Sequence, residues 1–180
     1  MFHLEPSNLS GCFEIRPKRI VDHRGCFVKV YQKDEFINLG LETNFVEEYY
    51  SHSHKDVIRG LHFQAPPMDH VKIVYCTHGS VFDVLLDLRK GSPSYGKTST
   101  FRLSSAQGNY LYIPKGVAHG FCATSAIATL VYKVSSIYAP QHDQGVLWSS
   151  VDIDWPTRHP IVSERDASFC HFDSFESPFE

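Results

Sequence analysis

Between residues 57 and 138 the sequence is a close succession of short apolar runs, each ended by residues that favour turns. The breaks between runs contain proline pairs, glycines and Gly-Ser-Pro or Gln-Gly combinations. Short strands separated by turn signals at this spacing predict a β-sandwich or a small barrel. The expected strands cover residues 57–64, 71–76, 81–88, 98–103, 110–113, 117–123 and 127–134.

The flanking segments add less regular structure. Before residue 57 we expect an edge strand within residues 1–20, strands at 27–31 and 45–51, and the only helix at 33–40, ended by Gly40. After Pro140 the chain becomes irregular and is expected to wrap the outside of the barrel, with residues 172–180 loosely held. We expect residues 1–180 to form one domain.

Composition excludes several functional classes. A formal net charge of -3 argues against general nucleic-acid binding. The five cysteines form no Cys-x-x-Cys pair, which argues against a disulfide framework and a structural zinc site and favours reduced thiols. The N-terminus lacks the regions of a signal peptide, and no apolar run approaches the length of a membrane span. We therefore expect a cytoplasmic protein without a membrane or nucleic-acid partner.

The segment from residue 57 to Lys72 concentrates chemically active side chains. His62 and Gln64 share one face of their strand, together with Ile58 and Gly60, because strand side chains alternate. His62 is either a functional base or a core histidine satisfied by a backbone carbonyl, and these residues alone do not decide between the two. Strict alternation puts Arg59 on the opposite face from His62, unless Gly60 marks a bulge.

Two further polar residues are expected inside the barrel. Lys72 shares its face with Val74 and Cys76, and a buried lysine needs an anion, for which Asp83 is available. The alternative is that this face is exposed and Lys72 is solvated. Tyr132 lies among aliphatic residues, where its hydroxyl needs a partner; taken alone, this pattern favours a satisfied core tyrosine.

The segment 108–119 has the spacing of the second cupin motif: Gly108, five residues, Pro114, one residue, Gly116, two residues and His119. The first cupin motif would supply a second histidine and a glutamate, but here Gln64 follows His62 and the nearest carboxylate is Asp69. That set is poor for a transition metal, so we expect no metal and no other cofactor. His52 and His54 are a further pair, expected on an exposed strand end.

Seven sequence motifs follow one another along the chain. They are Ile58-Arg-Gly-Leu-His-Phe-Gln64, Val81-Phe-Asp-Val84, Gly91-Ser-Pro93, Ile113-Pro-Lys-Gly-Val-Ala-His-Gly-Phe121, Val131-Tyr-Lys133, Tyr138-Ala-Pro140 and Ile153-Asp-Trp-Pro156. In this order they resemble the dTDP-4-dehydrorhamnose 3,5-epimerase family, and the resemblance runs from about Phe13 to Asp166.

The resemblance implies an all-β, cupin-type jelly roll that acts without metal as a homodimer with exchanged N-terminal strands. The implied reaction is inversion of carbon 3, carbon 5 or both in a nucleotide-linked 4-keto-6-deoxyhexose, within deoxysugar or surface-polysaccharide synthesis. By the same resemblance, His62 removes a proton, Asp166 orients His62, Lys72 steadies the enolate and Tyr132 returns a proton. The implied substrate contacts are Arg59, His119, Tyr138 and, from the partner subunit, Arg24.

The positions that touch the nucleotide base in this family differ here. Asp22-His-Arg-Gly-Cys-Phe27-Val-Lys29 stands for the usual Asp-Glu-Arg-Gly-Phe-Phe-x-Glu, and Glu47-Glu-Tyr49 stands for Gln-Asp-Asn. These changes favour a CDP-linked over a dTDP-linked substrate. We also count Phe27, Gln64 and Asp83 among the expected binding residues. The alternatives are the dTDP enzyme proper, a metal-dependent cupin and a non-catalytic sugar-binding cupin.

Overall fold

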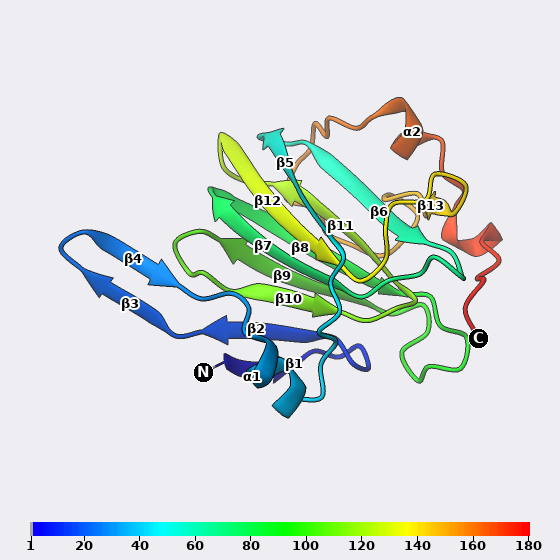
Figure 1. The fold of residues 1–180 in the computed structure, drawn as a ribbon. Helices are drawn as coiled ribbons and strands as arrows, with labels where there is room; N and C mark the ends of the chain where they lie inside the picture. The colour runs from blue at the N-terminus through cyan, green and yellow to red at the C-terminus, as the bar shows by residue number, and fades with distance from the viewer. Residues whose placement is uncertain (1) are drawn as a thin grey trace.

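The computed structural model describes residues 2–180, which form two large antiparallel sheets and one small one (Figure 1). The strand orders are β1-β2-β10-β7-β12-β5 in the six-stranded sheet, β13-β6-β11-β8-β9 in the five-stranded sheet, and β3-β4 in the small sheet. The elements in chain order are β1 Phe2–Pro6, β2 Phe13–Pro17, β3 Arg19–Asp22, β4 Gly25–Val28, α1 Lys33–Asn38, β5 Glu47–His54, β6 Ile58–Gln64, β7 Lys72–His78, β8 Ser80–Asp87, β9 Thr98–Ser104, β10 Tyr110–Ile113, β11 Val117–Ala123, β12 Ile127–Val134, β13 Asp143–Gly145, α2 Glu164–Ala167 and the 3₁₀ turn Phe172–Ser174.

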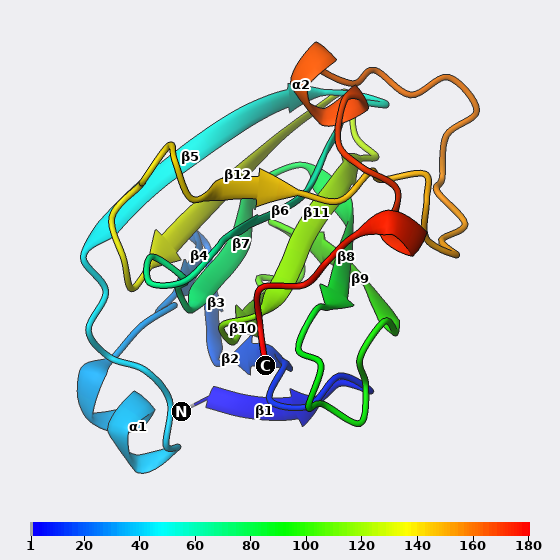
Figure 2. The ribbon, with the colours of Figure 1, turned by 90° about the vertical axis from the view of Figure 1, so that its right-hand side faces the viewer.

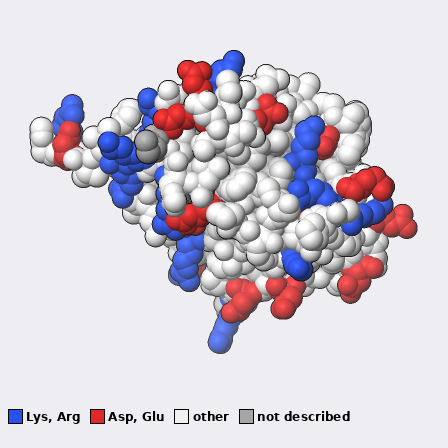
Figure 3. Space-filling view, turned by 90° about the horizontal axis from the view of Figure 1, so that it is seen from below, with Lys and Arg blue, Asp and Glu red and all other residues white. Residues whose placement is uncertain are grey.

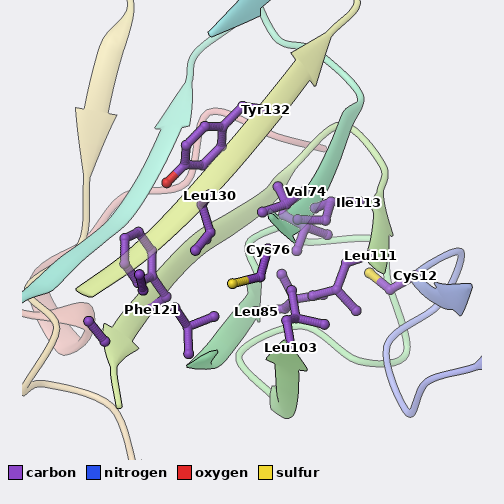
Figure 4. Close-up of a cluster of buried hydrophobic side chains, with 14 of the residues drawn as sticks. Cys12, Val74, Cys76, Leu85, Leu103, Leu111, Ile113, Phe121, Leu130 and Tyr132 are labelled. Carbon is purple, nitrogen blue, oxygen red and sulfur yellow. The ribbon is translucent and has the colours of Figure 1, made fainter. Parts of the chain in front are cut away.

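The two large sheets pack face to face, and this confirms the expected jelly-roll architecture. Their inner faces supply one apolar cluster, to which Val74 and Leu130 come from the six-stranded sheet and Leu85 and Phe121 from the five-stranded sheet. Figure 4 shows Tyr132 at one end of this cluster. The alternation predicted for Lys72 is confirmed: Val74 and Cys76 belong to this inner cluster, while Ile73 packs on the outer side of the sheet.

The chain after Pro140 covers the outer face of the five-stranded sheet, as expected (Figure 2). Two expectations about this region are wrong. Residues 172–180 are held in place, because Ser177 Oγ donates to the backbone oxygen of Leu88 and Phe179 is buried against Phe63. The segment also forms β13 and the short helix α2, so residues 33–40 do not contain the only helix. Within residues 2–180, no helix is long and apolar enough to cross a membrane.

The N-terminal part has more strands than expected. Residues 2–22 contain β1, β2 and β3 instead of a single edge strand, and β4 ends at Val28 instead of Tyr31. The hairpin β3-β4 pairs with neither large sheet and projects from the body of the molecule (Figures 1 and 3). Its apolar side chains are exposed, with Phe27 at 61% and Val21 at 68%.

A bulge at Gly60 decides which side chains of β6 face inward. His62 lies opposite His119 and Arg59 lies opposite Phe121, so Gly60 and Leu61 together face Gly120 alone. Gly60 has φ 126°, and a Cβ there would come within 2.5 Å of the Gly120 Cα, so only glycine fits. The extra residue turns Arg59 to the same side as His62. The expectation that Ile58 shares the face of His62 is therefore wrong.

Candidate active site

A cavity of about 400 Å³ opens between the two large sheets. This volume is in the range of sites for small organic ligands. Its walls combine charged, hydroxyl and aromatic groups from β5, β6, β7, β11, β12 and the segment after Pro140. The lining residues are Glu47, Tyr49, Ser51, Arg59, His62, Phe63, Gln64, His70, Lys72, His119, Phe121, Tyr132, Val134, Ser136, Tyr138, Asp143 and Arg165.

His62 forms a dyad with Asp166. Its Nε2 lies 2.9 Å from Asp166 Oδ1, and Asp166 Oδ2 accepts from the Gly60 N–H at 2.9 Å. Burial acts to raise the pKa of Asp166, but the bonds from His62 and Gly60 outweigh it and the pKa lies below its usual value. An ionised carboxylate only accepts, so the imidazole proton is on Nε2 and Nδ1 is the basic atom. The dyad therefore fixes the tautomer of His62.

The local sequence explains why Asp166 reaches β6 from far along the chain. Ser163 is the N-cap of α2, and its hydroxyl accepts from the Asp166 backbone N–H at 3.1 Å. A serine at this position starts a helix by satisfying one free N–H of the first turn. The single turn that follows holds Asp166 buried behind His62.

Lys72 is a buried cation in the cavity wall. Its Nζ donates to the backbone oxygen of His62 at 3.3 Å, and its exposed fraction is 6%. Burial lowers the pKa of Lys72 to about 8, and the carboxylates of Asp143 and Asp83 only partly oppose this. The expected pairing with Asp83 is replaced, because Asp83 bonds His119 instead. Lys72 thus lines the cavity with its ammonium bonded to a backbone oxygen and not paired with Asp83.

Tyr132 lines the cavity from the six-stranded sheet, opposite the five-stranded sheet that carries His62. It lies on β12, and its hydroxyl is 3.2 Å from Ser51 Oγ of the neighbouring strand β5. Its pKa is raised, chiefly because the ring is buried. His62 on β6 and Tyr132 on β12 therefore approach the same space from two facing sheets.

His119 and Asp83 form a second dyad. His119 Nε2 lies 2.9 Å from Asp83 Oδ2, and both side chains are buried. Asp83 lies behind His119 and does not line the cavity, so it differs from the direct binding residue that we expected. Burial raises its pKa, although His119 and Lys72 act in the other direction.

The side chains of Gln64 and Glu47 hydrogen-bond to backbone groups at the cavity rim. Gln64 Nε2 donates to the oxygens of Met68 and Ile137, and its Oε1 accepts from Ala139 N–H at 2.6 Å. Glu47 Oε2 accepts from Tyr138 N–H at 2.8 Å. Arg59 donates through Nε to Ser53 Oγ at 3.0 Å. The bonds of Gln64 and Glu47 hold the loop around residue 138 at the cavity rim.

Three expected binding residues lie outside the cavity. Arg24, Phe27 and Lys29 lie on or next to the projecting hairpin, whose charged tip is visible in Figure 3. Arg24 pairs with Asp22 at the hairpin turn, and both are largely exposed. Phe27 and Lys29 border a separate hollow of about 250 Å³.

Sequence reasoning missed several lining residues. Tyr49 and Ser51 alternate with Glu47 on β5, so the period of a strand could have placed them beside it. Arg165 directly precedes Asp166 and pairs with Asp143 at 2.8 Å. His70 has no such signal; burial, Lys72 and Lys115 lower its pKa to about 3, so it is neutral.

No group of three or more metal-ligating side chains lies together in the part of the chain that the structure describes. His52 and His54 lie on the exposed side of β5, as expected. His52 Nδ1 bonds Thr129 Oγ1 at 2.7 Å.

Comparisons with known proteins place this geometry among one group of enzymes. The family described as dTDP-4-dehydrorhamnose 3,5-epimerase matches residues 6–174. The dTDP-4-dehydrorhamnose 3,5-epimerase of Shigella flexneri is 41% identical over 153 residues, which are 83% of this chain and 84% of that protein. A dTDP-4-dehydrorhamnose 3-epimerase of Streptomyces niveus is 40% identical over 91% of this chain and 80% of its own length.

A solved structure agrees with these sequence matches. The crystal structure of dTDP-6-deoxy-D-glucose-3,5-epimerase from Legionella pneumophila, in complex with dTDP-4-keto-L-rhamnose, superposes with a TM-score of 0.93. The two chains are 32% identical, and the match covers 98% of this chain and 95% of the other. The chain therefore belongs to the dTDP-4-dehydrorhamnose 3,5-epimerase family and is a sugar-nucleotide epimerase.

Proposed function

We propose that this enzyme inverts carbon 3, carbon 5 or both of a nucleoside-diphosphate-linked 4-keto-6-deoxyhexose, using His62 as base and Tyr132 as acid. The observation that carries the proposal is the placement of these two groups on facing sheets around one cavity that also contains Lys72. Inversion requires a base on one face of the sugar ring and an acid on the other. The two facing sheets provide those opposite directions.

In the first step, His62 Nδ1 takes the proton from a carbon next to the C4 ketone. The electron pair of the broken C–H bond forms the enolate, and negative charge collects on the C4 oxygen. The Lys72 ammonium stabilises that charge, and a fixed cation in a cavity with little water is more effective than one in bulk solvent. Asp166 holds the imidazole and stabilises the imidazolium that forms.

In the second step, Tyr132 gives its hydroxyl proton to the same carbon from the opposite face. The enolate electron pair forms the new C–H bond, the C4 carbonyl returns, and a phenolate is left on Tyr132. Solvent then reprotonates Tyr132, and His62 releases its proton. The net reaction moves no electron to or from the enzyme, so the proposal needs no cofactor.

The diphosphate is assigned to polar side chains at the cavity wall and rim. Arg59 and His119 come from the same subunit and line the cavity. Tyr138 covers the rim, where Asp143 raises the pKa of its hydroxyl. The contact assigned to Arg24 comes from a second subunit, since Arg24 lies on the projecting hairpin.

We also infer a homodimer in which each β3-β4 hairpin completes the cavity of the partner. A two-stranded hairpin is marginally stable alone, and this one exposes Ile20, Val21 and Phe27 at more than half of their surface. Such a hairpin is stabilised when another sheet covers it. The exchange would bring the partner subunit's Arg24, the partner subunit's Phe27 and the partner subunit's Lys29 to the cavity.

Complementation of two inactive variants tests the exchange. In a heterodimer of His62→Ala and Arg24→Ala subunits, an exchanged hairpin gives one cavity with both defects and one cavity with none. We expect the heterodimer, purified after coexpression, to have about half of the activity of a wild-type dimer. If each hairpin served its own subunit, both cavities would carry a defect and activity would not return. Light scattering on the purified protein gives the mass of the assembly as an independent check.

Exchange in deuterated water tests the reaction itself. The enzyme is incubated with dTDP-, CDP- and GDP-linked 4-keto-6-deoxyglucose, and deuterium is located by mass and by carbon position. We expect deuterium at carbon 3, carbon 5 or both with at least one nucleotide. A protein that bound these sugars without incorporating deuterium would be a binding protein, and the proposal would be wrong.

We also propose that the enzyme acts in the cytoplasm, within deoxysugar synthesis. All five cysteines are unpaired, and Cys26 and Cys170 are exposed. Thiols persist in this state in a reducing compartment.

A further inference from the structure

The ring of Tyr132 is stacked on a second tyrosine. Tyr49 on β5 lies directly opposite Tyr132 in the β5–β12 ladder, and the two ring centroids are 4.9 Å apart with an interplanar angle of 15°. Aromatic residues opposite each other on one face of a sheet interact favourably. Tyr49 therefore covers one face of the Tyr132 ring.

Two other groups hold Tyr132 in place. Ser51 Oγ lies 3.2 Å from the Tyr132 hydroxyl, and the His119 ring meets the Tyr132 ring edge to face at 6.0 Å. Ser51 and Tyr49 lie on the same side of β5, since side chains alternate along a strand. The phenol is thus held at its hydroxyl, at one edge contact and over one face.

Tyr49 differs from the other two contacts in its exposure. Ser51 is half-buried and His119 is buried, but Tyr49 keeps 42% of its surface exposed at the cavity rim. Tyr132 beneath it is only 8% exposed. The Tyr49 ring is therefore the layer that separates the Tyr132 ring from solvent on that side.

We propose that Tyr49 is a positioning residue for the protonation step: its stacked ring holds the Tyr132 phenol toward the substrate and keeps water away from it. This inference rests on the proposed role of Tyr132 as the acid. Proton transfer needs the hydroxyl within hydrogen-bond reach of the carbon that receives the proton. A phenol free to rotate away from the enolate would leave time for His62 to return the proton to the original face.

Removing the Tyr49 ring should change how often the enolate is protonated by His62 and how often by Tyr132. Return of deuterium from His62 gives exchange with retention, whereas transfer from Tyr132 gives exchange with inversion. Loss of the stack should lower the inverted fraction and leave proton removal by His62 intact. From the strength of an aromatic pair we expect the ratio of inversion to exchange to fall about threefold to tenfold.

The test measures that ratio in deuterated water by NMR, using whichever of the dTDP- and CDP-linked 4-keto-6-deoxyglucose substrates the wild type converts faster. We expect Tyr49→Ala to lower the ratio and Tyr49→Phe to restore it, because phenylalanine keeps the ring. Tyr50→Ala is the matched control, since Tyr50 lies next in β5 but points to the other side, where it is 66% exposed. We expect this control to leave the ratio unchanged.

Several outcomes would overturn the inference. A Tyr49→Ala enzyme with an unchanged ratio and a raised KM would make Tyr49 a substrate contact. A proportional loss of exchange and inversion would indicate general damage to the fold. A lowered ratio in Tyr50→Ala would assign the effect to the strand and not to the stack. Tyr132→Phe distinguishes failure of the proposed acid from failure of its proposed positioning residue. If this variant leaves the ratio of inversion to exchange unchanged, Tyr132 is not the acid, and the proposed role of Tyr49 is wrong as well.

Discussion

His62 and His119 lie directly opposite each other in the β6–β11 ladder, and each uses Nε2 to bond a buried carboxylate. Asp166 comes from α2 behind β6, and Asp83 comes from β8 on the other side of β11. One ladder position therefore supports two histidine–carboxylate dyads in one cavity. Their surroundings differ, because the His62 ring keeps 28% of its surface exposed and the His119 ring only 4%. The more accessible histidine suits proton transfer, and the more buried one suits fixed binding.

His62→Ala should abolish deuterium exchange at every position of the sugar. General base catalysis contributes about 10²- to 10⁴-fold, and the dyad geometry is lost as well, so we expect a fall of several orders of magnitude. Exchange is measured by mass after incubation in deuterated water. His54→Ala is the control, since it removes an exposed histidine from β5. Substantial exchange in the His62 variant would contradict its role as base.

Tyr132→Phe should separate exchange from inversion. The base remains, so deuterium uptake driven by His62 persists, whereas net inversion falls by about 10²-fold or more. The hydroxyl is lost but the ring and its stack on Tyr49 are kept, which limits the change to the proton donor. The products are resolved by NMR. Inversion at the wild-type rate would make Tyr132 a core tyrosine without a catalytic role.

Loss of the Lys72 charge at alkaline pH should lower kcat/KM. Burial lowers the pKa of its ammonium to about 8, so the charged form is lost as the pH rises through this value. Because the charged form stabilises the enolate, kcat/KM should fall above about pH 8, and this parameter reports groups of the free enzyme. Lys72→Met should be slow at every pH and should lack this alkaline fall. Circular dichroism over the same pH range checks that the fold is retained.

The sequence and the structure agree best where the alternation of strand side chains is regular. Period-two alternation places Lys72 on one face with Val74 and Cys76, and the structure shows that this face is buried between the sheets. The sequence predicts only that Arg59 and His62 share a face if Gly60 forms a bulge. Whether the bulge forms depends on how closely Gly60 and Gly120 approach across the ladder. That distance is a property of the folded sheet.

The parts that the sequence predicted poorly depend on long-range packing. The tail after residue 172 has no periodicity, yet Phe175 and Phe179 both contact Phe63 on the outer face of the five-stranded sheet. The helix α2 is one turn long, too short to show an amphipathic pattern. The sequence pattern marks Tyr49 only as a departure from the family near the nucleotide base, because its stack on Tyr132 depends on the β5–β12 register.

The nucleotide preference is the last prediction: we expect a CDP-linked substrate to be used more efficiently than a dTDP-linked one. Thymine has a carbonyl acceptor where cytosine has an amino donor, and the adjacent ring nitrogen changes from donor to acceptor. Glu47 can only accept when ionised, and Lys29, which the proposed hairpin exchange would bring from a second subunit, can only donate. This polarity matches cytosine. The Glu47 carboxylate lines the cavity and is held by the Tyr138 N–H, which leaves its second oxygen to meet a base.

Side-by-side kcat/KM values for the CDP- and dTDP-linked 4-keto-6-deoxyglucose measure the preference. A mismatched base leaves buried polar groups unpaired at about 1–3 kcal/mol each, which corresponds to about a fivefold to 150-fold preference per group. The double variant Glu47→Gln with Lys29→Glu should reverse the order, because its amide can donate and its carboxylate can accept. The relatives compared above carry dTDP in their names. A clear preference of the wild type for the dTDP-linked substrate would contradict the prediction and would agree with those names. In that case Lys29 and Glu47 would not read the base, and the double variant should leave the ratio of the two substrates unchanged.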